Sequence, residues 1–207
     1  MIIPTMWVVK SFNDSIKEYL KSELIDEIII IDNKPESRPK LPTDNRIKIL
    51  TKGYNIFVNP AWNWGVKESK NDNLIFANDD VILIDVDRLL NEIITNKFPI
   101  IGVSIDEVNN TDGINIERVF GPMKRGFGCF FYINRLNYIF IPDELKIFYG
   151  DLILYNSTNE RYVFKTKKFK YQLSKTIKSD NNLISLIENS DKPLFNEKYK
   201  KIYQFNK

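Results

Sequence analysis

The most informative polar residues of this sequence are the consecutive Asn78, Asp79 and Asp80, which separate two apolar runs at 73–77 and 81–84. Adjacent Asp and Asn residues are common in solvated turns, which is the ordinary explanation for such a group. Here, however, the flanking apolar runs hold two carboxylates near a sheet edge, where negative charge requires a counter-charge. Carboxylate oxygens are hard ligands that favour Mg²⁺ or Mn²⁺. The group is therefore suited to a divalent cation that carries a diphosphate.

Histidine is absent from the sequence, and Cys129 is the only cysteine. Without histidine, Ser-His-Asp and Cys-His catalysis are excluded, and carboxylates are the natural acid–base groups near neutral pH. A single cysteine also excludes an intrachain disulfide, which fits a reducing compartment. Because Cys129 precedes Phe130 and Phe131, we expect it to be a small buried side chain rather than a nucleophile.

The bulk composition is that of a globular domain, with 43% hydrophobic and 28% charged residues in 207 positions. This length is enough for one α/β domain with a full core. The longest aliphatic runs, 28–31 and 81–84, are too short to cross a bilayer, and no signal peptide is visible. We therefore expect a cytoplasmic protein, in the host cytoplasm if the chain is viral.

The net charge of +3 is unevenly distributed along the chain. Residues 161–207 hold 12 Lys and Arg against 4 Asp and Glu, whereas residues 1–160 hold 18 against 23. We expect a solvated tail whose aromatic residues pack on the domain, and the alternative is peripheral contact of this basic segment with an anionic surface. We expect no nucleic-acid partner, because the acidic first 160 residues would repel a phosphate backbone.

Apolar periodicity divides the first hundred residues into alternating strands and helices. Continuous aliphatic runs such as 27–31 are typical of strands buried on both faces of a parallel sheet. We expect strands at 2–3, 27–31, 47–50, 73–77 and 99–104, and helices near 12–20, 59–69 and 86–94. The expected helix caps are Asn13 or Asp14, Asn59 followed by Pro60, and Asp85. Four βα units with short links predict one α/β domain with a mostly parallel, doubly wound sheet and helices on both faces.

Beyond residue 105 the pattern is mixed, with expected strands at 119–121 and 129–133 and a helix at 150–156. Ligands of open α/β sheets bind beyond the carboxyl ends of the strands. The residues expected there are Pro4, Thr5, Asp32, Asn33, Thr51, Lys52, Gly53, Asn78, Asp79 and Asp80. This edge of the sheet is therefore the predicted ligand site, with Asp32 suited to a base or ribose contact.

Four sequence blocks, in this order, resemble those of the inverting GT-A glycosyltransferases, the large family-2-like group. They are 2–5 (Ile-Ile-Pro-Thr), 29–33 (Ile-Ile-Ile-Asp-Asn), Asn55 with 61–65 (Ala-Trp-Asn-Trp-Gly), and 74–80 (Leu-Ile-Phe-Ala-Asn-Asp-Asp). The resemblance rests on the order of these four blocks rather than on any single one, and it spans residues 1–155. It implies the GT-A fold, a nucleotide-diphosphate sugar donor with UDP favoured, a Mn²⁺ or Mg²⁺ cofactor, and a glycan or glycoprotein acceptor. A compact enzyme of this type would suit a virus, a phage or a bacterial polysaccharide cluster.

The resemblance also implies roles for individual residues. The half 1–104 would bind the nucleotide sugar, the half 105–160 the acceptor, and 161–207 would form the basic C-terminal segment. The donor residues would be Pro4, Thr5, Asp32, Asn33, Lys52, Asn55, Asn63, Asn78, Asp79 and Asp80, with Asp80 as the metal ligand of a DxD-like motif. Arg125, Gly126, Phe127 and Gly128 would line the acceptor site. Asp151, in Phe-Tyr-Gly-Asp at 148–151, would be the general base.

Asp151 is chemically suited to that role, because inverting transfer needs one carboxylate to take the proton of the attacking hydroxyl. The alternative is a helix N-cap, which Asp also forms well. Three features depart from the family pattern: Asn78 replaces the usual first acid, Trp62 and Phe57 replace other residue types, and a late histidine is missing. Gln172 is the nearest substitute for that histidine, and Lys52 or Arg125 could supply part of the missing positive charge.

Two other function classes follow from the same residues. A nucleotidyltransferase shares the Rossmann-like half, but it would usually carry a Gly-rich loop with Lys or Arg after the first strand, unlike residues 5–9 here. A non-catalytic nucleotide-sugar-binding module of the same fold would explain Asn78 and the absence of histidine.

Overall fold

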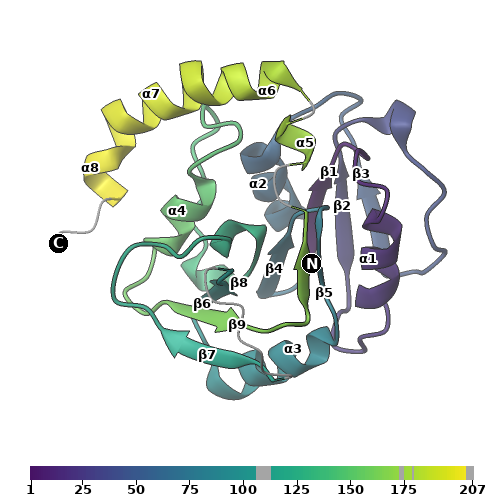
Figure 1. Ribbon diagram of the computed structural model, residues 1–207. Coiled ribbons are helices and arrows are strands. Elements are labelled where there is room, and N and C mark those ends of the chain that lie inside the picture. The colour runs from purple at the N-terminus through teal and green to yellow at the C-terminus, as the bar shows by residue number, and fades with distance from the viewer. Residues whose placement is uncertain (106–112, 173–174, 179, 204–207) are drawn as a thin grey trace.

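The computed structural model describes residues 1–105, 113–172, 175–178 and 180–203. Its centre is an eight-stranded sheet in the order β3-β2-β1-β4-β8-β6-β9-β7 (Figure 1). The strands are β1 (Ile2–Thr5), β2 (Ile28–Asp32), β3 (Ile47–Leu50), β4 (Asn73–Ala77), β6 (Ile100–Val103), β7 (Asn115–Arg118), β8 (Phe130–Asn134) and β9 (Tyr162–Lys165). Only β8 and β7 run antiparallel to their neighbours in this sheet. The predicted mostly parallel α/β sheet is therefore confirmed.

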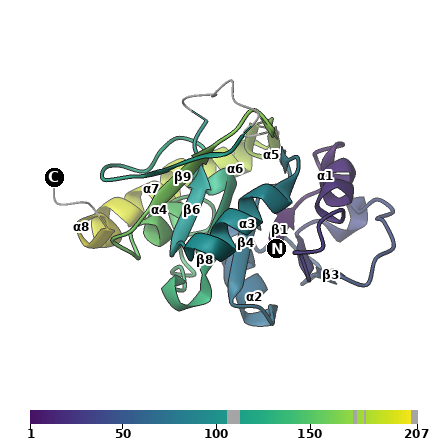
Figure 2. The same ribbon diagram turned by 90° about the horizontal axis from the view of Figure 1, so that it is seen from below.

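Helices cover both faces of the sheet because successive strand residues point to opposite sides. The larger helices are α1 (Phe12–Tyr19), α2 (Val58–Glu68), α3 (Val86–Asn96) and α4 (Gly150–Tyr155). Ile3, Ile28 and Ile30 pack with α1 and α3 in one core, whereas Ile2 and Ile29 pack with α2 and α4 in the other. Figure 2 shows α3 beside β4 and β8, which contribute Ile75, Ala77, Phe130 and Tyr132 to the same core. Buried aliphatic runs thus form a three-layer fold.

The C-terminal part of the chain is built into this fold. A separate two-stranded sheet pairs β5 (Val81–Leu83) with β10 (Phe169–Tyr171). The helices α5 (Lys175–Lys178), α6 (Asn181–Leu186), α7 (Lys192–Leu194) and α8 (Lys200–Tyr203) follow, with π-helical turns at Ile187–Asp191 and Phe195–Tyr199. Figure 1 shows α6 to α8 as one rod across the top of the molecule. Among the described residues, no helix has the length and apolar character needed to span a bilayer.

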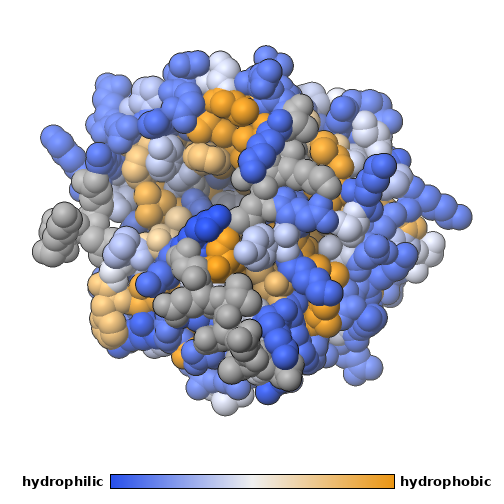
Figure 3. All heavy atoms as spheres, in the orientation of Figure 1, coloured by the Kyte–Doolittle hydropathy of each residue, from blue (hydrophilic) through white to orange (hydrophobic). Residues whose placement is uncertain are grey.

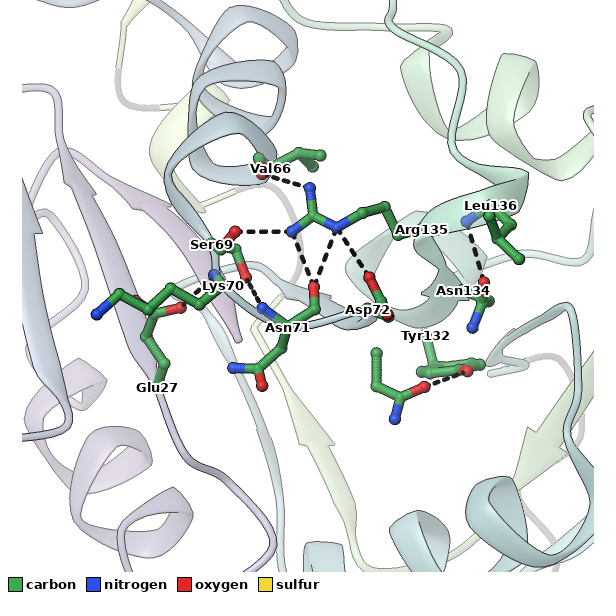
Figure 4. Close-up of polar contacts among 11 residues, drawn as sticks. Glu27, Val66, Ser69, Lys70, Asn71, Asp72, Tyr132, Asn134, Arg135 and Leu136 are labelled. Carbon is green, nitrogen blue, oxygen red and sulfur yellow. Dashed lines mark hydrogen bonds and ion pairs between the residues drawn. The ribbon is translucent and has the colours of Figure 1, made fainter.

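The end of α2 is fixed by Arg135 (Figure 4). Its guanidinium donates to the main-chain oxygens of Val66 (2.9 Å), Ser69 (2.8 Å) and Asn71 (2.8 and 3.2 Å). Carbonyls at a helix C-terminus lack partners within the helix, so a cation is favourable there. Arg135 lies in a short 3₁₀ turn directly after β8, and it therefore ties α2 to the centre of the sheet.

Three local assignments from the sequence were wrong. The strand expected at 119–121 lies at 115–118, and Val119 instead donates its backbone N–H to Arg161 O (2.8 Å). Helix α1 begins after Ser11, not after Asn13 or Asp14. Helix α2 begins after Phe57, so Asn59 lies inside the helix, and its buried side-chain N–H groups donate to the carbonyls of Leu145 and Phe148. Asp85 does precede α3, but its carboxylate accepts from Lys168 (2.7 Å) and makes no cap hydrogen bond.

Candidate active site

A cavity of about 500 Å³ lies beyond the carboxyl ends of β1 and β4. Its polar lining includes Pro4 and Thr5 after β1, Asn33 after β2, Asn55 before α2, the loop Asn78, Asp79 and Asp80 after β4, and Asp151 of α4. The segment 123–129 supplies another wall, which includes Arg125, Gly126, Phe127 and Gly128. The structure therefore brings most of the predicted site residues to one cavity, of the size usual for small-molecule sites.

The acidic loop is held by a hydrogen-bond chain from the end of β1. Thr5 Oγ1 donates to Asp79 Oδ2 (2.6 Å) and accepts from the backbone N–H of Trp7 (2.9 Å). Burial, with a further contribution from the charge of Asp80, raises the pKa of Asp79 from 3.8 to about 6. A buried carboxylate with a raised pKa is destabilised in its charged form, and a bound cation would remove that penalty.

The C-terminal part of the chain contacts the acidic loop through its backbone. Gln172, the suggested substitute for the missing histidine, donates its backbone N–H to Asp80 O (2.9 Å). This bond continues the β5–β10 ladder, in which Tyr171 lies opposite Val81. The acidic loop is thus held between the end of β4 and a strand from the C-terminal segment.

Asp151 faces the same cavity from the first turn of α4. Its Oδ1 accepts the backbone N–H of Leu152 (2.9 Å), and burial raises the pKa of its carboxyl. The N-cap position of α4 is occupied by Tyr149, so Asp151 is not the helix cap. A raised pKa moves a carboxylate toward the range in which a general base works at neutral pH.

Gly128 provides the space for the Asp151 carboxylate. A Cβ on Gly128 would collide with Asp151 Oδ2, so any side chain there would displace the candidate base. The next residue is Cys129. Burial raises the pKa of its thiol to about 12, and the charges of Asp80 and Asp151 contribute to this increase. Cys129 is therefore a neutral thiol at physiological pH. It is half-buried and lines the cavity, so the expected buried side chain is only partly confirmed.

Asn33 and Asn55 fix one side of the cavity, the turn before α2. Asn33 Oδ1 accepts from the backbone N–H of Ile56 (3.0 Å), and Asn55 Oδ1 accepts from that of Phe57 (2.8 Å). Both side chains fix the turn before α2, where Phe57 has a left-handed φ of 67°. Such strain in a non-glycine residue is often found at functional sites.

Three predicted donor residues lie outside the cavity lining. Asp32 is buried and accepts from Trp7 Nε1 (2.7 Å) and from the backbone N–H of Lys34 (3.0 Å). Asn63 donates to Ile141 O (2.7 Å), and its Oδ1 accepts from Tyr138 Oη (2.9 Å) and Ile141 N (3.0 Å). Lys52 stands over the ring of Trp64, 4.6 Å from its centroid. Asn63 thus braces the chain that leads to Asp151.

The lining also contains apolar residues that the sequence did not single out, among them Met6, Met123, Ile147, Phe148, Ile177 and Leu183. Residues 177 and 183 come from the C-terminal segment, about 100 positions after the acidic loop. Isolated apolar side chains in helical segments carry no sequence signal that distinguishes a cavity wall from ordinary core.

The donor set of the acidic loop fits a hard divalent ion. Asn78, Asp79 and Asp80 all line the cavity, and Mg²⁺ is usually held by one or two carboxylates together with phosphate oxygens and water. Within the ranges that the structure describes, no three Cys, Asp or Glu side chains form a closed protein cage. The residues therefore suit an ion shared with a bound phosphate group.

No protein-family model matches the sequence, and a search of curated proteins gives no match. Among solved structures, S. aureus TarS 1–349 superposes with a TM-score of 0.59 at 17% identity, over 92% of this chain and 65% of that one. HddC from Yersinia pseudotuberculosis gives 0.56 at 13% identity, over 86% of this chain and 97% of that one. The present chain thus spans less than two thirds of the TarS fragment. At these identities the likeness concerns the fold, and the predicted GT-A fold is confirmed.

Proposed function

We propose that this chain is a glycosyltransferase that moves one sugar from a nucleotide-diphosphate sugar to a hydroxyl of a glycan or glycoprotein, with inversion. One observation carries the proposal: a single cavity is lined both by the acidic loop Asn78 to Asp80, whose two aspartates are buried, and by a separate half-buried carboxylate, Asp151. The loop suits the diphosphate leaving group and its cation, and Asp151 suits the acceptor hydroxyl. Inverting transfer requires one such carboxylate on the face opposite the leaving group.

UDP is the favoured nucleotide. The TarS fragment, which shares the fold at 14% identity, has been solved with UDP-GlcNAc and with UDP. HddC has been solved with GMP-PN, so guanine nucleotides belong in the same test. Thr5, Asn33 and Asn55 offer the polar contacts for the nucleoside end of the donor.

Asp80, assisted by Asp79 and Asn78, would hold Mn²⁺ or Mg²⁺ in this enzyme. The ion would neutralise charge that develops on the departing diphosphate. Lys124 and Arg125 also line the cavity, and cations at that position stabilise the same charge. The chain's own residues then orient the donor, and Asp151 accepts the proton from the acceptor hydroxyl.

We further propose that the basic segment 161–207 brings the protein to an anionic surface in the cytoplasm. Its exposed rod carries Lys192, Lys198, Lys200 and Lys201. Two of these lysines pair with glutamates, Lys192 with Glu188 (2.8 Å) and Lys198 with Glu144 (3.9 Å), and the remaining charge would act through long-range attraction.

The test of the donor site is a thermal-shift panel of UDP-, GDP-, CDP- and dTDP-sugars with and without Mn²⁺. A ligand at 100 times its Kd stabilises the fold by about 2.7 kcal/mol, or roughly 5–10 °C for a domain of this size. We expect one nucleotide to give this shift with Mn²⁺ and Asp80→Ala to abolish it, while the exposed Asp14→Ala retains it. No shift with any nucleotide would refute the donor site.

Turnover then distinguishes an enzyme from a binding module. Asp151→Asn should bind the donor as tightly as the wild type and lose transfer, because the amide cannot accept the proton. A wild type that binds the donor but never consumes it would identify a non-catalytic module. If added pyrophosphate is consumed and the donor is converted to a sugar 1-phosphate and a nucleoside triphosphate, the chain is instead a nucleotidyltransferase.

A further inference from the structure

The C-terminal rod, α6 to α8 with its π-helical turns, presents a buried stripe to the rest of the domain. The buried residues of the rod recur every four positions and are Leu183, Ile187, Asp191 and Phe195. Residues at this spacing lie on one face of a helix. Figure 3 shows hydrophilic side chains along the upper edge, where the rod runs in Figure 1, and apolar side chains gathered just inside it. The carboxylate of Asp191 thus stands in an apolar stripe, where packing alone would favour an apolar side chain.

Asp191 is fully buried and accepts the backbone N–H groups of three consecutive residues. Its Oδ1 accepts from Lys146 (2.9 Å), and its Oδ2 accepts from Ile147 (2.7 Å) and Phe148 (2.9 Å). Hydrogen bonds to an ionised acceptor are shorter and stronger than those between neutral groups, and they offset the cost of burying the charge. The carboxylate therefore binds the turn formed by these three residues to the rod.

Asn59 of α2 holds the same turn from its other side. Its backbone N–H donates to Lys146 O (3.0 Å). Its side-chain N–H groups donate to the carbonyls of Leu145 (3.2 Å) and Phe148 (2.9 Å). The N–H groups of the turn thus bond to the rod, whereas its carbonyls bond to α2. Because both sets of backbone groups have partners, the turn is fixed between these two elements.

Asp151 follows this turn closely, as the second residue of α4. Between them, Tyr149 has a left-handed φ of 69°, which is unfavourable for a residue with a side chain. Its ring stacks on Phe195 of the rod, with 4.1 Å between centroids and 7° between planes. The next residue, Gly150, has no room for a side chain, because a Cβ there would collide with Asn59 Oδ1. Each position between the turn and Asp151 is therefore held by the rod or by α2, and these contacts set where α4 begins.

We propose that the rod positions Asp151 through two residues, Asp191 and Phe195. Neither of them lines the cavity, so both act through the chain before α4. Asp191 fixes the turn, and Phe195 holds Tyr149 in its strained conformation. The carboxylate of Asp151 is thereby kept against Gly128. This inference rests on the proposed function, in which Asp151 is the general base, and it adds two positioning residues to that base.

The test follows the Asp151 carboxyl directly, by ¹³C NMR titration of the whole chain without substrate, with the signal assigned from Asp151→Asn. Burial raises the pKa of this carboxyl in the wild type. Asp191→Asn keeps the size of the side chain but loses its charge and one acceptor oxygen. In this variant the Asp151 carboxyl should gain water and titrate at lower pH than in the wild type. The matched control is Glu188→Gln, a carboxylate-to-amide change at a rod residue whose side chain is 56% exposed, and it should leave the titration unchanged.

Phe195→Leu is the second variant, and it keeps an apolar side chain in the stripe while removing the stack on Tyr149. It should also move the titration of Asp151 to lower pH, and it tests the inference if Asp191→Asn does not fold. Donor binding is measured in the same proteins by calorimetric titration with Mn²⁺ and the nucleotide sugar selected by the thermal-shift panel. Both variants should keep the wild-type Kd, because a positioning role affects the carboxylate and not the donor site.

An unchanged titration of Asp151 in the folded variants would overturn the inference. A variant that loses the donor while Asp151 titrates as in the wild type would also overturn it, because the turn would then support the donor end of the cavity. Failure of the proposed function is observed separately. A wild type that binds no nucleotide sugar refutes that function, whereas the titration still decides whether the rod positions this carboxylate.

Discussion

Replacing Asp79 by Asn should stabilise the free protein at neutral pH. The pKa of Asp79 is raised from 3.8 to about 6, chiefly by burial. A raised folded-state pKa means that the folded protein holds this proton more tightly than the unfolded chain does. The stabilisation of the wild-type fold by this bound proton is therefore fully present below pH 3.8 and is lost as pH rises through 6. At pH 7.5 the ionised side chain remains as a cost to folding.

The size of this cost follows from the shift. About two pKa units at 1.36 kcal/mol each give roughly 3 kcal/mol at pH 7.5. Asn imitates the neutral acid and can still accept from Thr5 Oγ1, so Asp79→Asn should gain up to this amount. At pH 4 the gain should fall below about 1 kcal/mol, because Asp79 is then protonated in the folded protein.

The measurement is urea unfolding of wild type and variant at pH 7.5 and pH 4, in EDTA and without nucleotide. Asp14→Asn serves as a control, because the side chain of Asp14 is 73% exposed. A variant that is less stable than the wild type at pH 7.5, or equally stabilised at both pH values, would refute the electrostatic reasoning. The same variant should lose Mn²⁺-dependent donor binding, so its stability and its function should change in opposite directions.

Three other predictions concern the Asp151 side of the cavity. Gly128→Ala should lower kcat for transfer at least tenfold by displacing the Asp151 carboxylate, and donor binding should be retained. The control is Gly121→Ala, whose added Cβ meets no atom within 4 Å and which should leave kcat unchanged. The transfer rate should fall as pH drops through the raised pKa of Asp151, and a rate that does not fall on acidification of the folded protein would exclude this base. Asn63→Ala should cost about 2–4 kcal/mol of unfolding free energy, because it leaves buried partners at 138 and 141 unsatisfied; a loss under 1 kcal/mol in urea would contradict this.

Much of the parallel core could be predicted from the sequence. The aliphatic run at 28–31 is buried on both faces, as a central parallel strand requires. Because β4 lies beside β1 in that sheet, the order of the strands alone places Thr5 and the acidic loop together. Such predictions succeed because each depends on residues within one short segment and on a general rule of sheet topology.

The contacts that could not be predicted join residues far apart in the chain. Asn59 has the residue type and position of a helix cap, but its partners are carbonyls 86 and 89 residues further on. In the sequence, Asp191 is one polar residue in a basic segment. In the structure it is buried and accepts three backbone N–H groups from 146–148. Local propensity carries no information on such partners, which tertiary packing supplies.

The place of β9 in the sheet has a consequence for how the chain folds during synthesis. β9 lies between β6 and β7, with which it pairs in parallel and antiparallel ladders respectively. Strands β6 and β7 therefore leave the ribosome well before the strand that joins them, and they present open edges while residues 162–165 are still being made. The first half of the chain can assemble early around β1, β2 and β4, whereas the edge of the sheet at β7 closes last. Because residues 162–171 are synthesised late, their addition completes the sheet through β9 and the support of the acidic loop through β10.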